Sequence, residues 1–294
     1  MSPTDIHWLE WLTNPAGRTF WGFWLSSLVI ALSWALLDWP SRSALLRQWL
    51  SKAYWLHPSA RQDYWLIALN TLLFTLLGFS TLLWVIEIAN ISYQQLNKLA
   101  PPAQLAPTSG WLIAVYAVLL LLLDDASRYG LHRLLHSRWL WPLHRLHHSA
   151  TILTPLTFLR LHPLEQLLYQ CRSVLVHGTM SGSYFFLTQT TPELWLIFGV
   201  SGFVWLFNMF GANLRHSQIP LHYGWLEHLL ISPAQHQQHH AIGGLRCNYG
   251  SMLAIWDKSF GSWRSGRQVL PLPATTHSLI AQLFLKTPKS HHHD

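Results

Sequence analysis

Nine histidines between residues 132 and 240 have the spacing expected of metal ligands. Because an α-helix brings positions i, i+3 and i+4 onto one face, histidines at that spacing can direct their imidazoles toward one point. Imidazole binds iron and zinc well and magnesium or calcium poorly. Nine donors exceed what one ion can hold, so the pattern predicts a two-metal centre built almost wholly from histidine. The nine form four clusters: His132 and His136; His144, His147 and His148; His216; and His236, His239 and His240.

Chance is the alternative explanation for this pattern. The chain has 19 histidines, so a single i, i+3, i+4 triplet could arise on a solvated helix face. Two identical triplets after an i, i+4 pair favour a metal site instead. The isolated histidines are predicted to be ordinary surface or interface residues; they are His7, His57, His222, His228 and His277.

The composition predicts that this centre belongs to a membrane protein. Half of the residues are hydrophobic, 11% are charged and 18 are tryptophan, a residue favoured at membrane interfaces. A transmembrane helix needs about 20 apolar residues. Segments 20–37, 64–89 and 111–123 are predicted to span the membrane. The third is short, so a soluble core helix is its alternative, but its leucine run at 119–123 favours spanning.

Two weaker apolar stretches, residues 164–187 and 193–212, are predicted to form a hairpin that enters and leaves on the same side. Threonine and proline between them suit a helix cap and a first helical turn. The first arm is partly inserted or packs inside the bundle, where its polar side chains find partners. Those side chains are Glu165, Gln166, Gln170, Arg172 and His177.

Loop charge predicts the orientation. Lysine and arginine collect on the cytoplasmic side of membranes, and the loop at 38–63 holds four of them whereas the loop at 90–110 holds only Lys98. Counting crossings from the first loop places all four histidine clusters on the cytoplasmic face. The fold class predicted is an all-α integral membrane protein, with about three to five transmembrane or re-entrant helices and a cytoplasmic helical cap that carries the histidines.

The formal net charge of +7 could suggest a nucleic-acid partner. The basic residues follow the membrane loops, however, and the membrane explains them without a phosphate-binding patch. No nucleic-acid partner is therefore predicted.

The order and spacing of the motifs resemble those of the sterol desaturase and fatty acid hydroxylase superfamily, over about residues 110–265. Three residues separate the histidines of the first pair, as in the sterol-type branch. The predicted domains are membrane helices and loops at 1–110, a catalytic domain at 111–265 and a tail at 266–294. The motifs are Asp125-x3-Tyr129-x2-His132-Arg133-x2-His136, His144-x2-His147-His148-Ser149, Arg160-x-His162-Pro163-x-Glu165, Asn213-Leu214-Arg215-His216-Ser217, Ser232-Pro233-x2-His236-x2-His239-His240, Asn248-Tyr249-Gly250 and Trp256-Asp257-x2-Phe260-Gly261.

The resemblance implies a non-haem di-iron oxygenase that hydroxylates or desaturates a lipid, such as a sterol or a fatty acyl chain. Its cofactors would be two iron ions held by the nine histidines, with O2 as co-substrate and zinc as a substitute metal after purification. Its electron donor would be a reductase of the ferredoxin or cytochrome type. The chemistry agrees, because breaking an unactivated C–H bond needs a redox centre that side chains do not supply.

Two further residues are predicted to support the centre. Asp125 is seven residues before His132 on the same helical face and could accept a hydrogen bond from a ligand imidazole, whereas Asp124 points elsewhere. Asn213 is three residues before His216 and could approach a metal directly or through water. His162 and Asp257 also occupy motif positions, with a turn and a packing contact as their alternative roles.

Two other classes of protein stay open. A zinc-dependent membrane lipid hydrolase would usually carry a glutamate base between its histidine ligands, and here the intervening residues are Arg-Leu-Leu, Arg-Leu and Gln-Gln. A haem-type electron-transfer protein would hold axial histidines within facing spans, whereas these clusters lie beyond the spans. The sequence also leaves the lipid, and the choice among hydroxylation, desaturation and ether cleavage, undecided.

Overall fold

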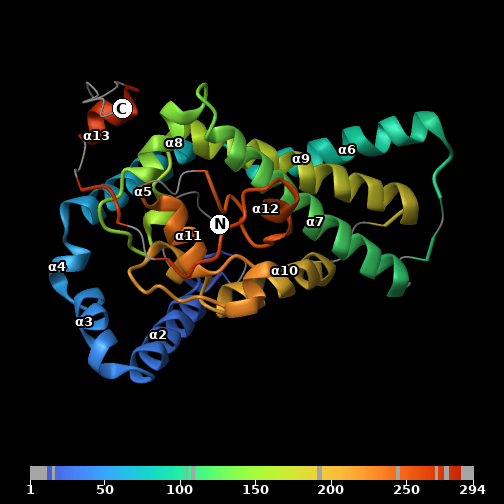
Figure 1. Cartoon of the computed structure of the whole chain (residues 1–294). Coiled ribbons are helices and arrows are strands. Elements are labelled where there is room, and N and C mark those ends of the chain that lie inside the picture. The colour runs from blue at the N-terminus through green and yellow to red at the C-terminus, as the bar shows by residue number, and fades with distance from the viewer. Residues whose placement is uncertain are drawn as a thin grey trace.

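The computed structural model describes residues 12–14, 17–103, 105–106, 110–190, 194–242, 246–268, 271–274 and 278–285, with the backbone alone for 194–201. Within these residues the regular structure is helical, apart from one isolated bridge between Leu230 and Leu253 (Figure 1). The predicted all-α fold is confirmed for this part of the chain. His7 and His277 lie outside the described residues.

The N-terminal helices hold one of the histidine segments in place. Helix α2 (Trp21–Leu36) and helix α3 (Trp39–Trp49) form a corner, followed by the short α4 (Lys52–Trp55). Ala31 and Ala35 of α2 share a buried apolar cluster with Leu214 and Ile219, which flank His216. Helix α2 coincides with the predicted first span but has only 16 residues, fewer than the roughly 20 that a span needs.

The predicted span at 64–89 is wrong as a single helix. The chain forms α5 (Pro58–Leu76) and α6 (Thr81–Leu99), with a 55° bend between them. Gly78 adopts a φ of +59°, a conformation that ends a helix, and the Ser80 hydroxyl caps the next one by accepting from the Leu83 amide. A glycine and a capping serine inside an apolar run therefore divide it.

Helix α7 (Gly110–Leu135) extends the predicted third segment as far as the first histidine pair and carries His132. By length and composition, α7 is the one helix among the described residues that could cross a membrane, and the bent pair α5–α6 would be a second if it counts as one span. Of the three segments predicted to cross, one meets this criterion as α7, one meets it only as the bent pair α5–α6, and α2 is shorter than the criterion requires.

The two arms of the predicted hairpin are helices, α9 (Pro163–Thr188) and α10 (Leu194–Met209), and residues 191–193 between them lie outside the described part. Helix α9 packs mainly on α6, whereas α10 packs on α7 and α2, so the hairpin itself stays a prediction. Glycines let α9 approach α6 closely, since a Cβ at Gly182 would overlap the Ala89 carbonyl and one at Gly178 would overlap Ile88. The polar side chains of α9 find partners inside the bundle, among them Arg172, whose Nη1 lies 2.8 Å from Asp124 Oδ1.

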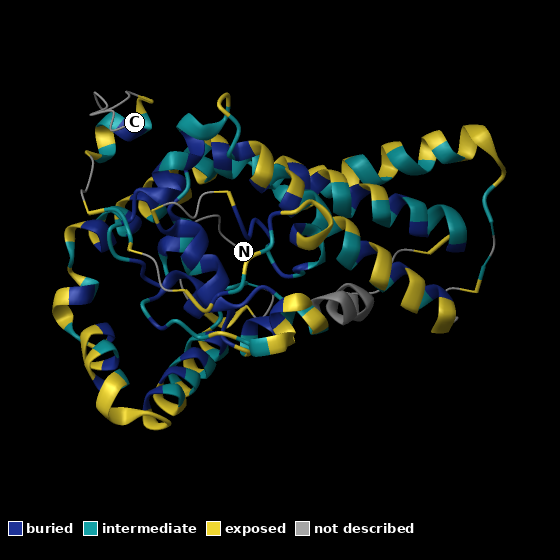
Figure 2. Cartoon of the chain, in the orientation of Figure 1, coloured by how far each residue is buried: buried dark blue, intermediate teal, exposed yellow. Residues whose placement is uncertain are grey.

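Short helices form a compact layer at one end of the long helices, and buried residues concentrate there, whereas α6 and α7 expose much of their length (Figure 2). This layer includes three of the four histidine clusters. Its elements are α8 (Trp141–His148), η1 (Thr157–Leu159), η2 (Ala212–His216), η3 (Gly224–His228), α11 (Pro233–His240), α12 (Ile255–Ser259) and α13 (Leu279–Leu283).

Candidate metal centre

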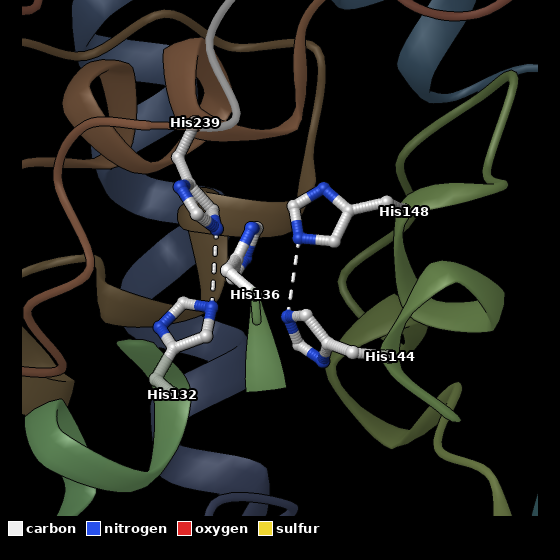
Figure 3. A group of neighbouring side chains, drawn as sticks. All are labelled: His132, His136, His144, His148 and His239. Atoms are coloured by element: carbon white, nitrogen blue, oxygen red, sulfur yellow. Dashed lines mark hydrogen bonds between the residues drawn. The ribbon is translucent and has the colours of Figure 1, made fainter. Parts of the chain in front are cut away.

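The structure brings all nine clustered histidines together in two adjoining groups. Within each group, one nitrogen of every ring lies within 4.8 Å of the others, and Figure 3 shows the rings of the first group pointing toward one another. The isolated histidines at 57, 222 and 228 belong to neither group. The first group is His132, His136, His144, His148 and His239, and the second is His147, His216, His236 and His240.

Each histidine triplet is divided between the two groups. On α8, His144 and His148 are four residues apart and face the first group, while His147 faces the second. On α11, His236 and His240 face the second group and His239 faces the first. The start of α11 is fixed by a capping box, in which Ser232 and Gln235 each accept a hydrogen bond from the other's backbone N–H.

The Nε2 atoms converge at distances that suit a shared ion. They are 3.1 Å apart in His132 and His239 and 3.2 Å apart in His144 and His148. In the second group, His216 Nε2 lies 2.9 Å from that of His236 and 3.3 Å from that of His147. Metal–nitrogen bonds of about 2.0–2.1 Å at right angles separate neighbouring ligand atoms by about 3.0 Å. The buried Nε2 of His136 has no hydrogen-bond partner within the described chain, as expected of a nitrogen that coordinates a metal ion.

Outer hydrogen bonds fix the orientation of four rings. His132 Nδ1 donates to the Tyr249 carbonyl, His239 Nδ1 to the Cys247 carbonyl and His144 Nδ1 to Glu165 Oε1, each at 2.7 Å. His147 Nδ1 lies 3.3 Å from the Arg160 carbonyl. A proton held on Nδ1 leaves the Nε2 lone pair free to face inward, which is the arrangement of metal-binding imidazoles.

Burial keeps the imidazoles in the form that binds metals. It lowers the pKa of His147 to about 3, and the nearby His132 ring contributes to the shift. The pKa values of His148 and His240 are also well below the ordinary range, first because of burial and then because of neighbouring imidazoles. A neutral ring is the form that coordinates a cation. The centre is thus a dense array of uncharged nitrogen donors.

Glu165 belongs to the site, although the sequence analysis gave it a motif position and no role there. Its side chain is fully buried, and Oε1 accepts from His144 while Oε2 has no partner among the described residues. A carboxylate on the outer nitrogen raises the basicity of a ligand ring. The signal available in the sequence was its place three residues after His162 at the start of α9.

The predicted hydrogen bond between Asp125 and a ligand imidazole is wrong. Seven residues of helix span about 10.5 Å, too far for Asp125 to contact His132. The Asp125 carboxylate instead accepts from the backbone amides of Met252 at 3.0 Å and Leu253 at 2.9 Å, and from Trp256 Nε1 at 3.0 Å. Asp125 therefore anchors the segment at 247–253, which supplies carbonyls to two of the histidines.

Asp257 anchors the same segment from the other side. Its carboxylate accepts from the Tyr249 amide at 2.8 Å, the Gly250 amide at 2.7 Å and the Ser262 hydroxyl at 2.6 Å. A Cβ at Gly250 would lie 2.8 Å from Asp257 Oδ2, so a side chain there does not fit without movement. The contact of Asp257 is thus structural. It positions the Tyr249 carbonyl, which accepts the hydrogen bond from His132.

Asn213 and His162 form hydrogen bonds with residues that are not members of the two histidine groups. Asn213 Nδ2 donates to the Arg18 carbonyl at 3.2 Å, and its Oδ1 accepts from Arg18 Nη2 at 3.3 Å. These two bonds engage both polar atoms of the Asn213 amide, and its approach to a metal, directly or through water, stays a prediction. His162 caps α9 by accepting from the Leu164 amide and donates through Nε2 to the Leu283 carbonyl.

A buried ion pair connects the centre to α5. Arg160 Nε lies 2.5 Å from Asp63 Oδ1, and both side chains are fully buried. The other Asp63 oxygen accepts from the hydroxyls of Thr154 and Thr157. Because the Arg160 carbonyl faces His147, this pair holds a backbone partner of the second group. The sequence reasoning did not identify Asp63.

Residues 117–262 match the fatty acid hydroxylase family. The chain is 27% identical over 158 residues to a Delta(7)-sterol 5(6)-desaturase of Gibberella zeae, covering 53% of this chain and 44% of that protein. It is 28% identical over 169 residues to an ornithine lipid hydroxylase of Rhizobium tropici, covering 56% and 46%. A second Delta(7)-sterol 5(6)-desaturase, from Aspergillus fumigatus, is 27% identical over 173 residues, covering 54% and 51%.

The chain thus spans about half the length of these curated relatives. No solved structure matches it. The matched region contains both histidine groups and the two carboxylates that anchor the segment at 247–253. The resemblance to the sterol desaturase and fatty acid hydroxylase superfamily is confirmed by the family match over residues 117–262 and by the similarity to a sterol desaturase and a lipid hydroxylase.

Proposed function

We propose that this protein is a membrane-bound non-haem di-iron oxygenase that uses O2 and two electrons to hydroxylate or desaturate a lipid. The observation that carries the proposal is the convergence of nine imidazoles in two adjoining groups. The first group would hold one ion and the second group the other. When bound, such ions supply the redox chemistry that cleaves an unactivated C–H bond. The names of the relatives, sterol desaturase and lipid hydroxylase, support a lipid substrate.

The donor set favours this function over the two alternatives. A zinc hydrolase usually has a carboxylate base beside its metal-bound water. Among the described residues, the one carboxylate that is hydrogen-bonded to a clustered histidine is Glu165, and it binds the outer nitrogen of His144. A haem would need its axial imidazoles on opposite sides of a wide flat ring. Here the ligand nitrogens of His132 and His239 are 3.1 Å apart, which leaves no room for that ring.

Exposed apolar side chains support membrane insertion. Helix α6 has no buried residue, and Leu82, Leu83 and Ile86 are each more than half exposed. Helix α7 likewise exposes Trp111 and Val118 by more than half. Exposed apolar side chains in this number mark contact with lipid or with a partner. We infer that α7 and the α5–α6 pair lie in the membrane, with the histidine layer on the cytoplasmic side.

The chain's own residues would position the substrate and control access. A cavity of about 240 Å³ is lined by His132 and His144 of the first group, by His147, His216 and His236 of the second, and by Phe158, Leu161 and Tyr169. A substrate carbon in this cavity would lie beside both groups. Two of the rings that border it are held by hydrogen bonds that they donate, His144 to Glu165 and His132 to the Tyr249 carbonyl.

An open cleft of about 610 Å³ offers a place for the electron donor, a reductase of the ferredoxin or cytochrome type. Arg133, Arg138 and Arg246 line it together with His136, and its described lining contains no acidic residue. Positive potential of this kind steers an acidic partner to the surface. Because His136 lines the cleft and belongs to the first group, a donor bound in the cleft would lie next to that group.

Metal analysis and turnover test the proposal together. Gently purified protein should contain about two metal ions per chain, iron plus zinc. With iron, a reductase and O2, a lipid extract should yield a product that has gained one oxygen atom or lost two hydrogen atoms. One ion per chain with all nine histidines intact would contradict the dinuclear centre, and O2-independent lipid cleavage would favour the hydrolase.

A further inference from the structure

The cavity beside the metal groups has an unusual charge. Besides histidines, it is lined by three arginines, Arg18, Arg128 and Arg215, and by a single acidic residue, Glu165. Glu165 is bound to His144 and offers no direct partner to the arginines. A cavity for a neutral lipid is expected to be mostly apolar with few charged groups. The surplus of positive charge therefore needs an explanation.

Arg18 has a hydrogen-bond donor that no described residue satisfies. It precedes α2, and its Nη2 reaches the Ala212 carbonyl and Asn213 Oδ1 at 3.3 Å each. Its buried Nε has no acceptor within the described chain, and its guanidinium lies 4.3 Å from the centre of the Phe158 ring. A buried guanidinium N–H without an acceptor is costly, so this position suits a ligand oxygen.

The other two arginines are only partly neutralised. Arg215 is buried and donates to two backbone carbonyls, those of Ala212 and Ser251, and no described carboxylate forms an ion pair with it. Arg128 pairs with Asp124, but Asp124 is shared with Arg172. The three cations line the same cavity of about 240 Å³. Burial lowers the pKa of Arg18, and the charges of Arg215 and Arg128 add to this effect.

We propose that this cavity binds an anionic oxygen group of the lipid, a carboxylate or a phosphate, through Arg18, Arg128 and Arg215, so that oxidation occurs near that group. The inference rests on the proposed function and narrows its substrate class. A cavity of about 240 Å³ is smaller than the roughly 300–1,000 Å³ of sites that enclose a drug-sized ligand, so it takes one part of a lipid only.

Three arginines in the cavity lining would favour an anionic lipid over a neutral one. An anion would make charge-assisted hydrogen bonds, two at once with a suitably placed guanidinium, and would neutralise part of the buried charge. A neutral hydroxyl would leave most of that charge uncompensated. Arg18 lies outside the region that matches the family, whereas Arg128 and Arg215 lie inside it.

Equilibrium binding of matched lipids tests the site. Purified, metal-loaded protein in neutral detergent is titrated with radiolabelled oleate and with oleyl alcohol, and separately with phosphatidate and diacylglycerol. In at least one pair the anionic member should bind about tenfold tighter or more, and the pair that shows the preference identifies carboxylate or phosphate. Equal affinities within both pairs would overturn the inference.

Arginine variants test whether the preference for the anionic lipid arises in this cavity. Arg18→Gln and Arg128→Gln should each reduce it about tenfold, whereas Arg42→Gln, a partly exposed arginine beside Asp38 and outside the cavity, should not. If Arg18→Gln fails to fold, Arg128→Gln alone decides, because its side chain is 41% exposed. A preference that survives in the folded cavity variants would refute the site.

Metal content of the same samples separates this inference from the proposed function. About two ions per chain without an anion preference would overturn the arginine site and leave the oxygenase proposal standing. An anion preference in a protein with one ion would support the arginine site and contradict the dinuclear centre.

Discussion

Replacing Asp125 with asparagine tests whether a carboxylate distant from the histidines holds the metal centre in shape. The carboxylate accepts three N–H groups, from Met252, Leu253 and Trp256, at 2.9–3.0 Å. An amide presents one oxygen and one NH2, so at least one of these donors would face another donor. If Asp125 were a buried acid tolerated only for packing, Asp125→Asn would instead raise the stability, because neutralising the carboxylate would remove a desolvation cost.

The magnitude follows from those three contacts. One buried donor left without an acceptor costs about 1–3 kcal/mol, and turning the remaining charge-assisted bonds into neutral ones costs about 1 kcal/mol each. Relief of carboxylate desolvation offsets part of this. We expect Asp125→Asn to lose about 2–4 kcal/mol of stability, or about 5–15 °C in Tm at about 2–4 °C per kcal/mol. Metal affinity should fall about tenfold as the Tyr249 carbonyl loosens from His132.

Thermal unfolding in detergent and metal analysis of the same sample give the two readouts. Asp38→Asn is the control, because Asp38 is half exposed and lies 3.7 Å from Arg42 on a helix surface. It should change stability by less than about 0.5 kcal/mol. If Asp125→Asn were as stable as the parent, or more so, with unchanged metal content, the anchoring of the segment at 247–253 by this carboxylate would be refuted.

Four further substitutions test other parts of the structure. Glu165→Gln should lower metal affinity about 10- to 100-fold at the first group, seen as loss of one of two ions during dialysis against a chelator, and full retention would dismiss its role. His239→Ala should abolish lipid turnover in an expressed protein, whereas the exposed His222→Ala should keep it, and equal activities would contradict the ligand assignment. Gly182→Ala should destabilise by about 1–3 kcal/mol because its Cβ would overlap Ala89, while Gly130→Ala, where nothing lies within 4 Å, should be neutral or stabilising in the same unfolding assay. Arg138→Glu should raise the KM for an acidic electron donor without lowering kcat, and an unchanged KM would place the donor elsewhere.

The histidine centre was predictable because its signal is local. Spacing of three and four residues brings the rings onto one side of a helix, and α8 and α11 each present three rings to the centre. The division of each triplet between two groups was not predictable in the same way. It depends on how α7, η2, α8 and α11 cross, which long-range packing decides.

The supporting residues were harder to predict for the same reason. Asp63 and Arg160 are 97 residues apart, and Asp125 and Leu253 are 128 apart, so no local pattern connects them. The break between α5 and α6 did have a local signal. Gly78 followed by Ser80 marks a helix end and a helix start, but the hydrophobicity of the surrounding run outweighed it in the prediction.

The division of the triplets makes the two groups a single mechanical unit. Helices α8 and α11 each supply rings to both groups, so a rotation or slide of either helix changes both sets of nitrogen distances at once. Neither group can be adjusted alone by moving a helix. Independent adjustment is left to the outer partners, with Glu165 and the Tyr249 carbonyl acting on the first group and the Arg160 carbonyl on the second.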